Sequence, residues 1–316
     1  MPLQIVSLEE KHLEDAAELV TMRYHSLRSR LPALPARCEQ PQAILELLRD
    51  LPVEAGGVAA VRGNRLVGFL TGMALPEFMG QRSVYSPDWA NGVAPDQSRR
   101  ITEEMYTRLS DRWVADGCYA HFVSVMAHDR QDVEAWNWLG FGLVNVDGVR
   151  PLTSIRAGSA GVEVRQATAQ DARELCELGR ALERHVAVAP TFWLHELEDF
   201  GERLNNPGNM AWLAHEAGKT VGFIALEPGE ECDCALLRDE KTTHISGAFT
   251  VEAARGRGVA AALLDQALTW ARAQGYARCA VDFESANSLA TRFWMRWFEP
   301  VSFSLERRID ERVRGE

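Results

Sequence analysis

The strongest constraint on the fold of this chain is one glycine-containing stretch near its C-terminal end, Thr250 to Leu264 (TVEAARGRGVAAALL). An apolar run with strand character, His244 to Val251, precedes a short turn, and an Ala- and Leu-rich segment with helical spacing follows it. Gly256 and Gly258 have no Cβ that could block a ligand, so backbone N–H groups at the helix start can converge on one anion. Together with the positive end of the helix dipole, these amides predict a phosphate or pyrophosphate site.

Two classes of phosphate ligand fit such a loop. Gly256, Gly258 and Ala261 satisfy the dinucleotide pattern G-x-G-x-x-G/A, and Asp282 lies near the distance expected of a ribose-binding acid. Only 58 residues follow Gly258 (316 minus 258), however, which is too few for the remaining βα units of a doubly wound sheet. Four residues, 252–255, also separate the strand from the first glycine, whereas a dinucleotide loop turns directly. Both observations disfavour a dinucleotide.

Arg255 to Ala260, read as R-x-x-G-x-A, resembles the coenzyme A pyrophosphate loop of the GCN5-related N-acetyltransferase (GNAT) superfamily. Residues 281–287 (VDFESAN), with Ala290 and the pair Phe293-Trp294, resemble that family's second signature, a strand that ends at Asn before a helix with Ala and two aromatic residues. Two motifs in order, one helix and one strand apart, are more specific than either alone. The plain alternative is that the glycine loop is only the first turn of a helix.

The composition is that of a soluble globular protein with room for two domains, since 46% of the 316 residues are hydrophobic and 25% are charged. No apolar run approaches 18 residues and the N-terminus has no signal pattern, so we expect a cytoplasmic protein that does not enter a membrane. The net charge of −11 gives no support to nucleic-acid binding and favours cationic amine substrates. Neither the cysteines nor the histidines have metal-ligand spacing, so we expect no metal.

The pattern of elements occurs twice along the chain. The first half predicts strands and helices in the order 5–7 (strand), 9–31 and 42–51 (helices), 58–61, 66–73 and near 84 (strands), 97–115 (helix), 119–126 (strand) and 132–139 (helix). The order restarts with 162–166 (strand), 169–186 and 190–204 (helices), and 211–215 and 220–226 (strands). Val221-Gly222-Phe223 repeats Val67-Gly68-Phe69 at an offset of 154 residues. We therefore predict an internal repeat, divided into residues 1–154, a small-residue linker 155–161, and residues 162–316.

The repeat resembles two GNAT folds in tandem that cover nearly the whole chain. The resemblance implies an α/β class (an α+β mixed sheet), in which each fold has a mostly antiparallel, splayed sheet flanked by helices. Its fourth and fifth strands separate, and the wedge between them receives the pantetheine arm of an acyl-CoA.

The first copy lacks the residues that carry the resemblance. When Gly117 is aligned with Gly275, residues 97–102 (QSRRIT) stand opposite Arg255 to Ala260, and Arg100 replaces Gly258. In the second motif, this comparison aligns Arg130 with Asn287 and Asn137 with Trp294. We expect the N-terminal half to be a degenerate, non-catalytic GNAT-like domain. The alternative is a second acyl-CoA site of different geometry.

For the C-terminal half, the resemblance implies a catalytic GNAT domain that uses acetyl-CoA as co-substrate and needs no metal. Backbone N–H groups of the glycine loop would hold the pyrophosphate, and the edge of the preceding strand would pair with the pantetheine arm. One N–H of that strand could stabilise the thioester oxygen. Asn287 would contact the arm or cap the helix that follows it. The residues expected to bind the cofactor are Phe249, Thr250, Val251, Arg255, Gly256, Arg257, Gly258, Val259, Ala260 and Asn287.

Direct acyl transfer to an amine needs a base for the amine proton and an acid for the leaving thiolate. Asp282 matches the strand position of a catalytic glutamate in ribosomal-protein N-acetyltransferases that share this motif, so it is the first candidate base. His244 is the second because an ordinary histidine pKa suits the task, and Glu284 is the third. The plain alternative is that Asp282 is an exposed strand carboxylate and His244 a strand-entry residue facing solvent. The family's usual acid, a tyrosine, is replaced by Trp294, which is a departure from the pattern.

The sequence therefore predicts an acetyl-CoA-dependent N-acetyltransferase that acts on a primary amine by direct attack in a ternary complex. A small-molecule amine and a peptide N-terminus both remain open as acceptors, and the protein is expected to be a monomer or a homodimer. Two alternatives remain. One is a CoA-binding regulatory or interaction protein without turnover, and the other is an acyltransferase with a different acyl-CoA or a hydroxyl acceptor.

Overall fold

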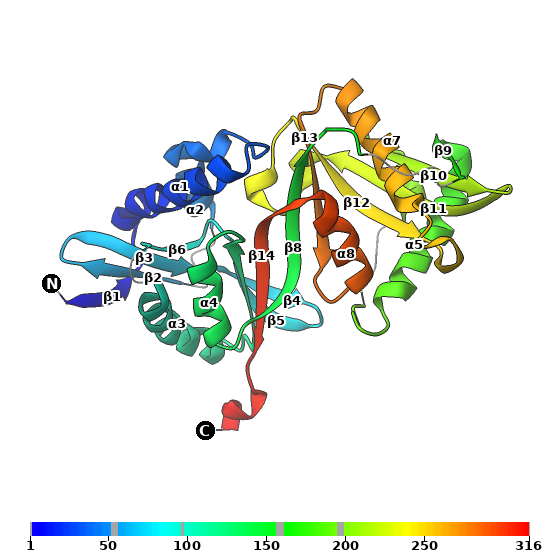
Figure 1. Ribbon diagram of the computed structural model, residues 1–316. Coiled ribbons are helices and arrows are strands. Elements are labelled where there is room, and N and C mark those ends of the chain that lie inside the picture. The colour runs from blue at the N-terminus through cyan, green and yellow to red at the C-terminus, as the bar shows by residue number, and fades with distance from the viewer. Residues whose placement is uncertain (1, 52–55, 96–97, 156–160, 195–198, 316) are drawn as a thin grey trace. The chain divides into compact units, whose positions relative to one another are not determined.

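The computed structural model describes residues 2–51, 56–95, 98–155, 161–194 and 199–315, and Figure 1 shows its helices and strands. The chain forms two compact units. Unit 1 comprises residues 1–146 and 300–316, and unit 2 comprises residues 147–299. The compact units therefore differ from the expected division at residues 154 and 162. Most of the expected linker, residues 156–160, lies outside the described residues.

Unit 1 contains two small sheets and four helices among its described residues. The strand orders are β1-β2-β3-β6 and β4-β5-β7-β14, and neighbouring strands are antiparallel except for the parallel pair β5 and β7. Its elements are β1 (Leu3–Ser7), α1 (Leu13–Arg30), α2 (Pro41–Asp50), β2 (Gly57–Arg62), β3 (Arg65–Thr71), β4 (Met73–Phe78), β5 (Gln81–Ser86), β6 (Asn91–Val93), α3 (Ser98–Ala115), β7 (Ala120–Met126), α4 (Arg130–Trp138) and most of β14 (Glu299–Arg308).

Unit 2 has one sheet whose strands run in the order β13-β12-β11-β10-β9. The strands β9 to β12 are antiparallel to their neighbours, whereas β12 and β13 are parallel. Its elements are β9 (Glu163–Gln166), α5 (Ala172–Val186), α6 (Phe200–Arg203), β10 (Met210–Glu216), β11 (Lys219–Pro228), β12 (Thr242–Thr250), α7 (Val259–Ala273), β13 (Arg278–Glu284) and α8 (Ser288–Trp297). The strand β8 (Gly142–Pro151) begins in unit 1 and ends in unit 2.

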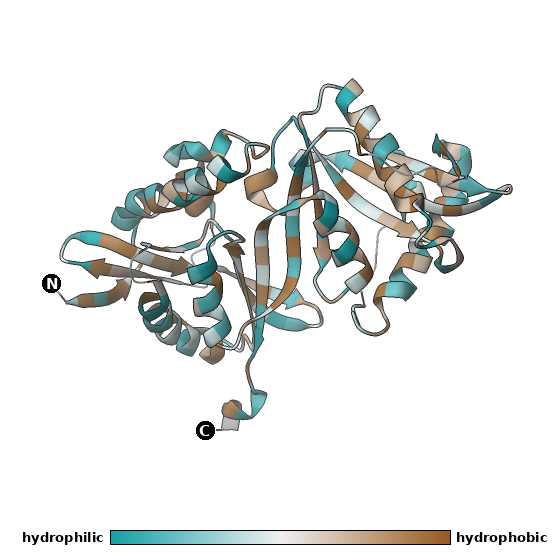
Figure 2. Cartoon of the chain, viewed as in Figure 1, coloured by the Kyte–Doolittle hydropathy of each residue, from teal (hydrophilic) through white to brown (hydrophobic). Residues whose placement is uncertain are grey.

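Helices cover both faces of the sheet in unit 2. A Cβ at Gly222 would lie 3.4 Å from Leu263 of α7, whereas the ring of the next residue, Phe223, lies 4.9 Å from that of Phe200 in α6. Because successive residues of a strand point to opposite faces, α7 and α6 lie on opposite sides of β11. Figure 2 shows apolar residues along the strands and hydrophilic residues on much of the helix surface, as such a layered arrangement requires.

The parallel strands β12 and β13 separate part of the way along their length. Their register pairs Thr242 with Arg278 and ends where Ile245 meets Val281. Beyond this point β12 continues to Thr250 along β11. The structure thus contains the wedge between two central strands that the sequence predicted for the second half.

The repeat is visible in the structure, with one change in its alignment. Asp129 caps α4 and Asn287 caps α8, and each side-chain oxygen accepts a hydrogen bond from the backbone N–H three residues later, at 3.2 Å. The counterparts of Asn287 and Trp294 are therefore Asp129 and Trp136, one residue earlier than Arg130 and Asn137. The expected comparison of Arg130 and Asn137 is wrong by this one step.

A second expectation fails between the first and second helices of unit 2. The sequence predicts a helix over residues 190–204, but residues 187–194 form turns and irregular structure, and among the described residues only Phe200–Arg203 is helical. Phe192 has a φ of +52°, in the left-handed region that a helix interior does not contain.

Candidate functional site

The turn between β12 and α7 forms a backbone cradle. Gly256 has a φ of +72° and Gly258, the residue that caps α7, has a φ of +87°. Both lie in the left-handed region that glycine adopts without strain. A Cβ at Gly256 would meet no heavy atom within 4 Å, so the backbone conformation and not crowding calls for glycine there. The first N–H groups of α7 have no partner within the helix, which makes this turn suited to an anion.

The two arginines of the cradle are tied to the protein. The Nε of Arg255 donates to the backbone oxygen of Thr250 at 3.0 Å, and its guanidinium lies 5.5 Å from the ring centre of Phe249. Arg257 pairs with Glu216 of β10, with Nη1 3.1 Å from Oε2. These contacts hold the turn in place. Because both guanidinium groups already have partners in the protein, we assign anion binding to the backbone amides of the turn.

A cavity of about 370 Å³ runs along the cradle and α8. His185 of α5 also borders this cavity, and burial and the charge of Arg255 hold the pKa of His185 below its ordinary value. Of the residues that the sequence assigned to the cofactor, Val251 and Arg257 lie outside its lining. The others line it, namely Phe249, Thr250, Arg255, Gly256, Gly258, Val259, Ala260 and Asn287.

A second cavity of about 800 Å³ borders the separated parts of β12 and β13. Its charged residues come from α6, β11, β12, β13 and the segment after β11, namely Arg203, Glu227, Glu231, Asp233, His244, Asp282 and Glu284. Five residues border both cavities: Leu182, Ala248, Asn287, Ala290 and Trp294. The cavity of the cradle and the acidic cavity therefore meet at the wedge.

His244 lies between two carboxylates in the acidic cavity. Its Nδ1 is 3.2 Å from Oε1 of Glu227, and its Nε2 is 3.0 Å from Oδ1 of Asp282. A neutral imidazole has only one N–H, so donation to both carboxylates requires the imidazolium. Burial alone would lower the pKa of His244, but the hydrogen bonds and charges of Asp282 and Glu227 outweigh it and raise the pKa to about 10. His244 is thus charged at neutral pH and does not keep the ordinary pKa that suggested it as a base.

The sequence reasoning missed Glu227 and Arg203. Glu227 is buried and pairs with both His244 and Arg203 of α6, so it has a cation on each side. The only signal in the sequence is a single carboxylate at the end of the apolar strand residues 221–226. Its pairing partner, His244, is 17 residues away and becomes visible only through the register of β11 and β12.

Among Asp282, His244 and Glu227, the side chain of Asp282 is the most accessible to solvent. Its side chain is 44% exposed, against 8% for Glu227 and 9% for His244. One of its oxygens receives the hydrogen bond from His244, and the residue borders the acidic cavity. A carboxylate in this position can accept a proton from a group in the cavity.

Asn287 and Trp294 lie at the junction of the two cavities. Asn287 is buried and caps α8 through Ala290, so both roles considered for it, cap and wall of the cofactor cavity, are compatible with its position. Trp294 is 7% exposed and packs edge-on against Phe293 and Phe298, with ring centres 4.7 and 5.5 Å away. It supplies an apolar wall at the position where the resemblance in sequence implied a tyrosine hydroxyl.

Among the described residues, no group of three or more His, Cys, Asp and Glu side chains is placed to hold a metal ion. Within the same residues, no helix combines the length and the apolar character needed to span a membrane.

Comparison with known proteins places this geometry in context. Residues 173–298 match the family model described as the acetyltransferase (GNAT) family. Among curated proteins nothing matches. A solved GCN5-related N-acetyltransferase from Sphaerobacter thermophilus is 14% identical and similar in fold, with a TM-score of 0.58 over 97% of this chain and 95% of that one. A GCN5-related glucosamine N-acetyltransferase region of a fungal multi-domain GH3 β-N-acetylglucosaminidase is 12% identical, with a TM-score of 0.54 over 96% of this chain and 38% of that one.

The fold likeness to the Sphaerobacter protein extends over almost the full length of both chains. The expected fold, a mixed α/β arrangement of two GNAT-like copies, is therefore confirmed.

Proposed function

Because residues 173–298 belong to the acetyltransferase (GNAT) family, we propose that this chain is an acetyl-CoA-dependent N-acetyltransferase whose active site lies in unit 2. One observation carries the proposal. A cavity bordered by a backbone anion cradle meets an acidic cavity at the point where β12 and β13 separate. Such a junction brings a phosphate-bearing acyl donor and a cationic acceptor together at one place.

The cradle and the free edge of β12 provide the donor side. The N–H groups at the start of α7 receive the pyrophosphate, because they lack partners in the helix and lie at its positive end. The part of β12 beyond Ile245 no longer pairs with β13, so its backbone is available to the amide groups of the pantetheine arm. A backbone N–H of the same stretch stabilises the thioester oxygen as charge develops on it.

The acidic cavity provides the acceptor side. A primary amine is cationic in neutral water, and the carboxylates of Asp282, Glu284 and Glu231 attract it. A small-molecule amine and a peptide N-terminus both fit this chemistry. The amine must lose a proton before its nitrogen can attack, so a base is needed within the cavity.

Asp282 is the base in this proposal. One proton of the ammonium passes to the carboxylate of Asp282, the neutral nitrogen forms a bond to the acyl carbon, and the bond from that carbon to sulfur breaks with its electron pair on sulfur. The second proton that the nitrogen loses goes to this thiolate, which leaves as the free thiol. His244 positions Asp282 and carries the compensating positive charge, while Glu227 and Arg203 hold His244 in place. A thiolate leaves without help from a strong acid, since an ordinary thiol pKa is about 8.5. This makes a tryptophan at position 294 compatible with turnover.

Release of free thiol tests the proposal. The purified chain is mixed with acetyl-CoA and a panel of acceptors that includes monoamines, diamines, amino sugars and peptides with a free N-terminus. Turnover with at least one amine is expected, and Asp282→Asn should lower kcat by about 10² to 10⁴-fold, the usual contribution of a general base. Glu284→Gln, two residues further on the same strand, is the matched comparison because it removes only a charge that attracts the amine, so it should raise KM and leave kcat nearly unchanged. Equal losses in both variants would contradict the role of Asp282.

A CoA-binding protein without turnover is the second candidate, and Trp294 favours it because no hydroxyl stands where the family usually has its acid. It predicts that calorimetry detects CoA binding while no amine in the panel releases thiol. Repeating the panel with longer acyl-CoAs and with hydroxyl acceptors distinguishes the remaining enzyme alternative.

A further inference from the structure

Unit 1 repeats the elements that form the wedge in unit 2, so the counterpart of each wedge residue can be found from the structure. A 3-10 turn precedes both α1 and α5, and these helices begin at Leu13 and Ala172, so Arg23 and Leu182 are both the eleventh residue of their helix. The helix caps match Asp129 with Asn287, and therefore Asp132 with Ala290.

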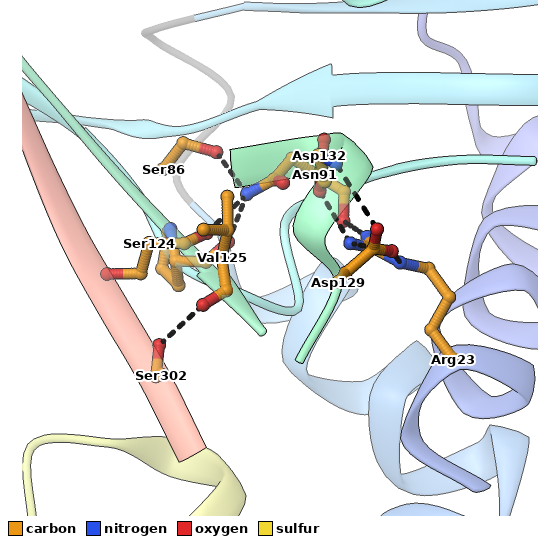
Figure 3. Close-up of polar contacts among 9 residues, drawn as sticks. Arg23, Ser86, Asn91, Ser124, Val125, Asp129, Asp132 and Ser302 are labelled. Atoms are coloured by element: carbon orange, nitrogen blue, oxygen red, sulfur yellow. Dashed lines mark hydrogen bonds and ion pairs between the residues drawn. The ribbon is translucent and has the colours of Figure 1, made fainter. Parts of the chain in front are cut away.

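The strands give the remaining counterpart. Val93 pairs with Gly68 in unit 1, and Thr250 pairs with Gly222 in unit 2. The residue two positions earlier is Asn91 in the first case and Ala248 in the second. Four of the five residues that border both cavities of unit 2 are thus replaced in unit 1 by an arginine, an asparagine and two aspartates, which Figure 3 shows together, whereas Trp136 keeps the tryptophan of position 294.

The guanidinium of Arg23 binds all three partners. Nη2 donates to Asp132 at 2.5 Å, Nε donates to Asp129 at 3.3 Å, and Nη1 donates to the backbone oxygen of Asn91 at 3.2 Å. Arg23 and Asp132 are 7% and 3% exposed, so the pair lies in the interior of unit 1. Burial alone would lower the pKa of Arg23, but the two carboxylates outweigh it and keep the guanidinium charged.

The same residues also close the gap between the strands. A Cβ at Gly92 would lie 2.9 Å from Nη1 of Arg23, so the guanidinium rests directly against the backbone of β6. The side-chain amide of Asn91 donates to the backbone oxygen of Ser124 in β7 at 3.0 Å and to that of Pro87 at 2.8 Å. In unit 2 the corresponding strands, β12 and β13, have separated and border open cavities at this level.

The groups proposed for proton transfer are missing as well. Register matches Met73 with Glu227 and Tyr85 with His244, and Ser124 then takes the place of Asp282. The hydroxyl groups of Tyr85 and Ser124 lie 3.0 Å apart, a neutral contact in place of two ion pairs.

Within the described residues, the segment of unit 1 that corresponds to the cradle, from Ser98 to Thr102, is helical. Arg100, the counterpart of Gly258, lies within α3 and pairs with Glu104 one helical turn away, at 2.8 Å. Gly258 has a left-handed conformation and precedes the first residue of α7, whereas Arg100 is an ordinary helical residue with a long side chain.

We infer that the ion cluster of Arg23, Asp129 and Asp132 fills the wedge of unit 1 at the level of the acyl arm, beside a cavity of about 640 Å³ that Arg23 and Asp129 border, and that the chain binds a single acyl-CoA, in unit 2. The cluster takes the position that the acyl arm has in the proposed site and links the elements that border it. Unit 1 then has a structural role, because its own side chains occupy the place that a ligand would take.

Calorimetric titration of the full chain with CoA measures the number of sites. The expected result is one site per chain, and Gly258→Val, which strains the cradle, should remove all binding. Two sites in the unaltered chain, or one site left in Gly258→Val, would overturn the inference. Absence of binding in the unaltered chain would refute the proposed function together with the single site in unit 2, whereas the filled wedge of unit 1 would still be decided by the stability of variants at Arg23.

Three variants test the ion cluster itself. Arg23→Leu introduces the residue of unit 2 but leaves Asp132 buried without its cation, so the thermal midpoint should fall markedly. Arg23→Leu combined with Asp132→Ala removes both charges, and part of the lost midpoint should return. Arg100→Leu breaks an exposed ion pair and should change the midpoint little. If Arg23→Leu is as mild as Arg100→Leu, or the second substitution gives no recovery, the cluster does not fill the wedge as inferred.

Discussion

At the scale of single residues, the charge on His244 makes the stability of the fold depend on pH. The pKa of His244 is raised from 6.5 to about 10 by its two carboxylate partners. A group whose folded pKa is raised stabilises the fold fully below pH 6.5, and this contribution is lost as the pH rises through about 10. Each pKa unit corresponds to about 1.4 kcal/mol, so a few kcal/mol are involved. We expect the difference in free energy of unfolding between the unaltered chain and His244→Gln to shrink from pH 6.5 to pH 10.

Urea unfolding at a series of pH values measures that difference. His25→Gln is a suitable control because the side chain of His25 is 54% exposed, and its effect on the free energy of unfolding should be small throughout. A constant difference for His244→Gln over the whole range would show that its charge is not held by Glu227 and Asp282.

The residue that the sequence did not reveal, Glu227, allows a second prediction. Removing its charge with Glu227→Gln should lower the pKa of His244 by about 1 to 3 units, the usual effect of an opposite charge at this distance. Titration of the imidazole signals by NMR can follow this pKa directly. An unchanged titration would mean that Asp282 alone holds the proton of His244.

At the scale of elements, the turn from β12 into α7 depends on glycine for its backbone shape. Gly256 and Gly275 both have left-handed φ values, +72° and +90°, and a Cβ at either would meet no atom within 4 Å. Alanine at either position should therefore destabilise the fold by a similar amount, about 1 to 2 kcal/mol. Only Gly256→Ala should also weaken CoA binding, because Gly275 lies beyond the other end of α7. Calorimetry on both variants separates loss of the cradle from general strain, and equal affinities would argue against the cradle.

The same elements show how far the sequence could predict the structure. The turn, the start of α7 and the cap at Asn287 are set by local preferences of Gly and Asn, and they were predicted. Pairings between distant segments were not, because register depends on contacts that no short stretch encodes. Glu227 and His244 meet only through such a pairing. Helical spacing in residues 190–204 was misleading, since most of its described part is irregular.

At the scale of the whole chain, the last strand in the sequence belongs to unit 1, although it follows directly after unit 2. The final strand, β14, follows the last helix of unit 2 but pairs with β7 of unit 1, from Ser302 opposite Met126 to Arg308 opposite Ala120. Leu305 belongs to the core of unit 1 and is 1% exposed. Local patterns divide the chain near residue 154, yet unit 1 is incomplete without its last residues. A division based on repeats alone therefore misses this dependence.

Removing β14 should therefore destabilise unit 1. Unit 2, which precedes β14 in the sequence, should stay folded. We expect a chain that ends at Glu299 to lose amide protection in β7, because the ladder from β14 is gone and the site of Leu305 is left empty. Hydrogen exchange should show β10 and β11 of unit 2 unchanged, since their pairing involves only residues of that unit. The substitution Leu305→Ala is a milder version with the same direction. If β7 keeps its protection in the shortened chain, residues before 147 form a self-sufficient domain, as the sequence pattern alone suggests.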